Sequence, residues 1–121
     1  MAILLHARLA NTALLFFLFM AVWGFWRFFR QQGLGSSYWG AALIAEVLIL
    51  FQGGLGLYLW ITDSPPARGG IHDLYGVALA LAVPLVYSYT RGRQDRAEML
   101  LYAVAFLIMC GLVLRAMVTG S

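Results

Sequence analysis

The chain has 121 residues, of which 63% are hydrophobic and 11% are charged, and its formal net charge is +3. A water-soluble domain of this size needs far more polar surface than this composition can provide. The composition therefore excludes an ordinary soluble protein. We interpret the positive charge as a consequence of membrane topology and not as a signal for nucleic-acid binding.

Four apolar segments are long enough to cross a bilayer, because about 30 Å of hydrocarbon requires about 20 helical residues. They cover residues 3–26, 39–61, 71–89 and 98–119. Short connections join them, and connections of that length place consecutive helices side by side in opposite directions. The sequence predicts an all-α fold: one domain over residues 1–121, an integral membrane four-helix bundle of up-down-up-down topology.

The arginines predict the orientation, since the chain contains no lysine. Five arginines lie in the first and third connections: Arg27, Arg30, Arg91, Arg93 and Arg96. The second connection carries only Arg68. By the positive-inside rule the first and third connections face the cytoplasm. We therefore expect a multi-pass protein of the plasma (inner) membrane with both termini on the extracytoplasmic side.

The two histidines occupy equivalent places, His6 at the start of the first segment and His72 at the start of the third. These segments run in the same direction, so both side chains are expected near the outer face, about 12–14 Å from the bilayer midplane. A lone histidine at a helix end is more often an interfacial polar residue. Two at matched depth that both face the bundle interior have the arrangement that a bis-histidine haem requires, with His6 and His72 as iron ligands.

Small residues follow both histidines on the same helix face. Ala10 lies four residues after His6, and Gly76 lies four residues after His72. The second segment adds Gly53 and Gly56 within QGGLG. These positions leave room for the edge of a flat macrocycle. The alternative remains open that they are ordinary packing residues between membrane helices.

Arginines on the same side of the membrane are candidate partners for the two carboxylates of a haem. Arg115 lies in the last part of the fourth segment, at about the depth of the histidines, and Arg8 and Arg68 lie on the same side. The planar guanidinium suits a carboxylate, and an arginine inside a membrane span is costly enough to suggest a function. The alternative is that Arg115 extends to the outer headgroups.

Glu46 is an isolated carboxyl group inside the second segment, six residues before Gln52. It is interpreted as one partner of a hydrogen bond between helices, or as part of a proton or quinone path with Gln52. Pro84 in the third segment predicts a kink or widened packing. The single cysteine, Cys110, excludes an internal disulfide and is expected to be a small buried residue.

The segment AEVLILFQGGLGLYLWI, followed after a short connection by HDLYGVALALAVPLVY, resembles the haem A synthase family of membrane proteins. In that family a helix with a Gln-Gly-x-x-Gly-like segment precedes one that opens with a ligand histidine, and HARLANTALLFFLF resembles the earlier ligand helix. The likeness covers nearly three helices, and the chain corresponds to a single four-helix half of such a protein. It implies that His6 and His72 hold haem near the outer face.

Family members consist of two fused bundles with their ligands on the second and fourth helices of each, whereas this chain has one bundle with histidines on the first and third. This favours a haem-binding module over haem A synthesis. We predict a membrane haem b protein that transfers electrons or carries haem within a larger respiratory or photosynthetic complex. Its expected partners are the lipid bilayer and other membrane subunits or a redox partner.

Two other functions stay open. The chain is alternatively a cofactor-free structural or accessory transmembrane subunit, or a pigment subunit in which one histidine ligates the magnesium of a chlorophyll. The sequence contains no recognisable nucleophile-base pair, phosphate-binding loop or metal-ligand cluster. Hydrolytic and transferase chemistry therefore have no support.

Overall fold

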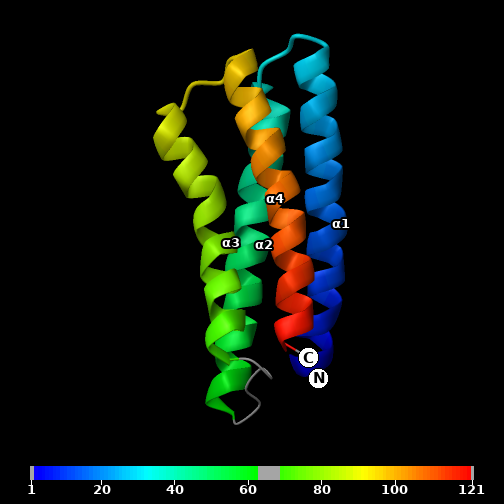
Figure 1. Cartoon of the computed structure of the whole chain (residues 1–121), viewed down its shortest axis with the longest axis vertical. Coiled ribbons are helices and arrows are strands. Elements are labelled where there is room, and N and C mark those ends of the chain that lie inside the picture. The colour runs from blue at the N-terminus through cyan, green and yellow to red at the C-terminus, as the bar shows by residue number, and fades with distance from the viewer. Residues whose placement is uncertain (1, 63–68, 121) are drawn as a thin grey trace.

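The computed structural model describes residues 2–62 and 69–120, which form four helices. These are α1 (Ala2–Phe29), α2 (Gly35–Ile61), α3 (Gly69–Thr90) and α4 (Arg96–Gly120). They run alternately up and down, and the two termini lie at the same end of the molecule (Figure 1). The described residues contain no strand, so the predicted all-α four-helix bundle is confirmed.

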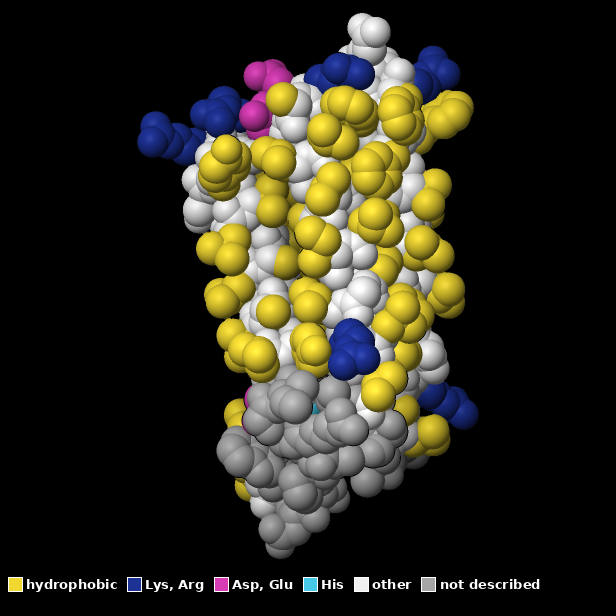
Figure 2. All heavy atoms as spheres, in the orientation of Figure 1, with side chains coloured by type: hydrophobic (Ala, Val, Ile, Leu, Met, Phe, Trp, Pro, Cys, Tyr) yellow, Lys and Arg dark blue, Asp and Glu magenta, His cyan; other side chains and the backbone are white. Residues whose placement is uncertain are grey.

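Each of the four helices is long and apolar enough to cross a membrane. Most of their large hydrophobic side chains point outward and are exposed in the isolated chain. Figure 2 shows these side chains over the middle of the visible face, while most of the charged side chains on that face gather at one end. The chain is therefore a multi-pass membrane protein whose apolar outer surface faces lipid.

The helices are longer than the apolar segments by one to four residues at most of their ends. The largest difference is at the start of α2, which begins at Gly35 and not at residue 39. Hydropathy marks only the part of a helix inside hydrocarbon, whereas the backbone hydrogen bonds continue through the interface. Arg27 lies in the last turn of α1, where its positive charge interacts favourably with the negative end of the helix dipole.

The packing places α1 and α3 at opposite corners of the bundle. Helix α1 packs against α2 and α4, and α3 packs against the same two helices. A side chain that points inward from α1 therefore faces one that points inward from α3. This arrangement decides whether the two histidines can meet.

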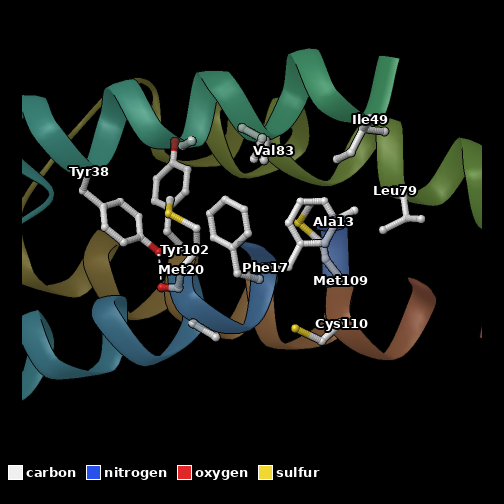
Figure 3. Close-up of a cluster of buried hydrophobic side chains, with 14 of the residues drawn as sticks. Ala13, Phe17, Met20, Tyr38, Ile49, Leu79, Val83, Tyr102, Met109 and Cys110 are labelled. Carbon is white, nitrogen blue, oxygen red and sulfur yellow. Dashed lines mark hydrogen bonds between the residues drawn. The ribbon is translucent and has the colours of Figure 1, made fainter. Parts of the chain in front are cut away.

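The centre of the bundle is filled by large side chains that are almost completely buried, among them Phe17, Met20 and Tyr102 (Figure 3). Tyr38 is also fully buried, and its hydroxyl group donates a hydrogen bond of 2.9 Å to the carbonyl oxygen of Met20. The ring of Tyr38 packs against Trp23 with 4.9 Å between the ring centroids. The Tyr38 hydroxyl group thus has a hydrogen-bond partner inside the core, as buried hydroxyl groups usually do.

We call the end that carries the α1–α2 and α3–α4 connections the arginine end, because it contains Arg27, Arg30, Arg91, Arg93 and Arg96. The opposite end, which contains His6 and His72, is the histidine end. At the arginine end the two connections are joined by a hydrogen bond of 3.0 Å from the backbone nitrogen of Leu34 to the carbonyl oxygen of Gln94. Arg96 also donates to the carbonyl oxygen of Phe28 at 2.9 Å and lies over the Phe28 ring.

Candidate functional site

The two histidines meet across the interior of the bundle. His6 lies in the second turn of α1 and His72 in the first turn of α3, and both side chains are half-buried. The centroids of their rings are 6.2 Å apart, and the ring planes make an angle of 70°. The structure therefore brings together the two residues that the sequence singles out as ligands.

The separation of the rings fits two ligands on opposite sides of one metal ion. A ring nitrogen lies about 1 Å from its ring centroid and about 2 Å from a bound metal, so two such rings in line have centroids about 6 Å apart. Two ligands at a tetrahedral angle would have centroids only about 5 Å apart by the same geometry. The observed 6.2 Å is close to the first value, and it also lies in the range of an ordinary edge-to-face ring contact.

His72 is oriented by a hydrogen bond to α4. Its Nδ1 atom lies 2.9 Å from the carbonyl oxygen of Ala116. A carbonyl oxygen only accepts hydrogen bonds, so Nδ1 carries the proton and, in the neutral ring, Nε2 holds the lone pair. Metal-ligating histidines commonly have this tautomer, with the second nitrogen bound to a carbonyl or carboxylate oxygen.

The hydrogen bonds around His6 differ from those around His72. Its Nδ1 atom is buried and has no hydrogen-bond partner among the described residues. Gln52 of α2 lies against it: the Nε2 atom of Gln52 donates a hydrogen bond of 2.7 Å to the backbone carbonyl oxygen of His6. The Oε1 atom of Gln52 is also buried without a partner in the described part of the chain. Such atoms are rare in folded proteins, and here two of them belong to residues in contact.

Among the small residues, Gly56 is the one that borders the histidines. A Cβ atom added there would lie 3.4 Å from Cε1 and 3.9 Å from Nε2 of His6. Gly53 and Gly76 are exposed, and a Cβ atom at either would meet no described atom within 4 Å. Ala10 is half-buried on α1. Among the described glycines named here, Gly56 is thus the one next to the pair, and the role of Gly53, Gly76 and Ala10 beside a ring stays a prediction.

Two of the three arginines predicted to bind haem carboxylates, Arg8 and Arg115, lie in the described part of the chain. Arg115 directly precedes Ala116, so its backbone lies at the depth of the bond to His72. Its side chain is exposed, and so is that of Arg8, two residues after His6. Arg68 lies outside the described residues. Arg8 and Arg115 are therefore exposed at about the depth that the sequence predicts.

Glu46 lies apart from the histidines, about 9 Å along α2 from Gln52 in the direction of the arginine end. Its Oε1 atom is buried and has no partner among the described residues, so the predicted hydrogen bond between helices is not found at this atom. Glu46 borders a groove of about 280 Å³ between α2 and α3. The other residues of this groove are Trp39, Leu43, Val83, Pro84, Tyr87 and Ser88.

Sequence reasoning missed the contact between Gln52 and His6. A signal for it was present, because Gln52 and Gly56 are four residues apart and share one face of α2. A polar side chain and a glycine on one face of an apolar helix indicate a place where another group approaches. The pattern alone does not tell which group that is.

No three histidine, cysteine, aspartate or glutamate side chains in the described part of the chain come together as a metal-ion site. A porphyrin brings its own four nitrogen ligands, so the protein has to supply only the axial ones. A scan against protein-family models, a search of curated proteins and a search of solved structures each found no match. The resemblance to haem A synthases therefore rests on the quoted residues alone.

Proposed function

We propose that this membrane protein binds haem b between His6 and His72 and acts as an electron-transfer or haem-carrying module of a larger respiratory or photosynthetic complex. The observation that supports the proposal most is the meeting of two imidazole rings from opposite corners of the bundle, with centroids 6.2 Å apart. Ordinary edge-to-face packing accounts for the angle of the two rings but not for the buried Nδ1 atom of His6, which has no partner among the described residues.

Different residues of the chain would bind different parts of the haem. His6 and His72 would hold the haem iron through their ring nitrogens. The carbonyl oxygen of Ala116 keeps the His72 ring in the tautomer that suits a ligand. Arg8 and Arg115 are the described cations near enough in depth to bind the haem carboxylates. When bound, the iron supplies a one-electron redox couple.

The distribution of the arginines and the family resemblance support the same proposal. The excess of arginines at the other end favours an orientation in which the histidines lie on the outer side of the plasma (inner) membrane. The resemblance to one half of the haem A synthase family gives the same pair of ligands. Electron transfer through one haem needs an electron donor and an electron acceptor, so we expect partner proteins in the membrane.

The test is the absorption spectrum of the protein purified from cells supplied with haem. We expect a Soret band and a sharp α band on reduction, and we expect His6→Ala and His72→Ala to lose both. Leu5→Ala and Leu74→Ala are matched controls, since these exposed side chains neighbour the histidines on the sequence. Both controls should keep the spectrum.

Two results would contradict the proposal. One is a folded, helical wild-type protein that stays colourless although haem was available. The other is a low-spin haem spectrum that survives in both histidine variants. A magnesium pigment extracted from the protein in place of haem would favour the pigment-binding alternative.

A further inference from the structure

The two candidate ligands differ in what supports them. The Nδ1 atom of His72 has the Ala116 carbonyl oxygen as its acceptor, at 2.9 Å. The Nδ1 atom of His6 is buried and has no partner among the described residues. A ligand whose second nitrogen is unsupported is poorly oriented, and its basicity is not tuned. His6 therefore needs an acceptor that α1 itself does not supply.

Gln52 is in position to be that acceptor. Its Nε2 atom is tied to the carbonyl oxygen of His6 at 2.7 Å, which fixes the side-chain amide beside α1. Its Oε1 atom belongs to the same planar group, is buried, and has no partner in the described part of the chain. One turn further along α2, Gly56 borders the Cε1 edge of the His6 ring. The face of α2 that carries Gln52 and Gly56 therefore covers this imidazole.

We propose that Gln52 is the positioning residue of His6, and that its Oε1 atom accepts a hydrogen bond from Nδ1 when Nε2 is bound to the haem iron. This inference rests on the proposed function. One hydrogen bond would satisfy both buried atoms that now lack a partner. The two side chains already lie against each other, and the last torsion of histidine, about which the imidazole would turn, is broad. Both ligands would then have the same support, a carbonyl oxygen on a neighbouring helix.

The proposal predicts opposite effects for two substitutions at one position. Gln52→Met has a similar length but no acceptor, so it should weaken haem binding by about 10-fold or more and raise the midpoint potential. Gln52→Glu keeps an acceptor and makes it stronger. A stronger acceptor increases the basicity of the imidazole and stabilises the oxidised iron, so the potential should fall below that of the wild type.

A merely structural role gives a different pattern. If Gln52 only anchors the His6 backbone through its Nε2 donor, a carboxylate cannot replace it, and the Met and Glu variants should shift the potential in the same direction. Leu50→Ala is the control, because this exposed residue lies on the other side of α2. It should leave both haem affinity and potential unchanged.

The measurement is a redox titration of the haem bands in the wild type and the three variants, with helical content checked by circular dichroism. Potentials above and below the wild type, for Met and Glu respectively, support the proposal. Haem in the wild type, with both variants shifted alike or unshifted, overturns the role of Gln52 and leaves the proposed function intact. If Gln52→Glu does not fold, a Met variant with unchanged affinity and potential overturns it equally. A wild type without haem overturns both.

Discussion

The two ends of the bundle are built in different ways. At the arginine end the helices are joined by hydrogen bonds between connections, by Arg96 over Phe28, and by the buried Tyr38 hydroxyl group on Met20. At the histidine end two imidazoles face each other, and two buried polar atoms on His6 and Gln52 have no partner among the described residues. The joined connections at one end, and the buried atoms of His6 and Gln52 without a described partner at the other, indicate a division between holding the fold and receiving a ligand.

This comparison has a direct consequence for mutation. Substitutions at the arginine end should change the free energy of unfolding and leave haem binding as it is. Substitutions at the histidine end should do the reverse. The following variants test that separation in order of decreasing expected effect.

The largest effect is expected when both ligands are removed together. His6→Ala with His72→Ala should abolish haem binding completely, because the iron loses both axial ligands. The haem-free double variant should unfold at nearly the same denaturant concentration as the haem-free wild type, since both side chains are only half-buried. Haem titration and unfolding monitored by circular dichroism measure the two quantities. A haem-free double variant that fails to form helices would show that the ends are not separate.

Gly33→Ala should be the most destabilising single change at the arginine end. A Cβ atom there would collide with the backbone carbonyl oxygen of Gln94, which also accepts the hydrogen bond from Leu34. Overpacking against backbone cannot be relieved by rotating a side chain, so we expect a loss of about 3 kcal/mol in the free energy of unfolding. Gly40→Ala is the control, because its Cβ atom would meet nothing within 4 Å. Equal stabilities of the two variants would contradict this account.

Gly24→Ala should cost somewhat less. Its Cβ atom would lie 2.8 Å from the Cβ atom of Ala103 and 2.8 Å from the hydroxyl oxygen of Tyr38, where α1 packs closely on α4. We expect a loss of about 2 kcal/mol, because these neighbours have to shift. Unfolding in a mixed-detergent series measures it, and haem affinity should be unaffected. A haem affinity that falls with stability would weaken the separation of the ends.

The smallest effect is expected for Tyr38→Phe. The substitution removes the hydrogen bond to Met20 and keeps the packing of the ring, so it should cost about 1 kcal/mol. Tyr89→Phe is the matched control, since Tyr89 is 74% exposed. The same unfolding assay compares the two. A loss as large for Tyr89 as for Tyr38 would mean that the buried hydroxyl group does not stabilise the core.

The fold could be predicted from the sequence because membrane spans are defined by length and apolarity alone. The matched depth of His6 and His72 followed from the direction of the chain, since the first and third helices of an up-down bundle are parallel. Their contact also required that both helices turn these residues inward. The start of α2 at Gly35 was missed because hydropathy does not report the helical turns in the interface. The ends of helices in the interface depend on local hydrogen bonds, which cannot be inferred from the pattern of apolar residues.

The partner of His6 could not be predicted for a different reason. The helices are apolar almost all round, so the pattern does not fix how each one is rotated about its axis. Gln52 faces His6 only because α2 has one particular rotation, which the packing determines. The same uncertainty affected Glu46, for which sequence reasoning favoured a hydrogen bond between helices. The structure places Glu46 on a groove between α2 and α3, and its Oε1 atom has no partner among the described residues.

The most direct test of the account is the electron paramagnetic resonance spectrum of the oxidised wild-type protein, recorded with its reduced-minus-oxidised absorption spectrum. We predict a low-spin ferric signal of bis-histidine type, with one haem per chain, that disappears when either His6 or His72 is replaced by alanine. A folded protein with no haem signal, or a high-spin signal from iron with only one histidine ligand, would contradict it.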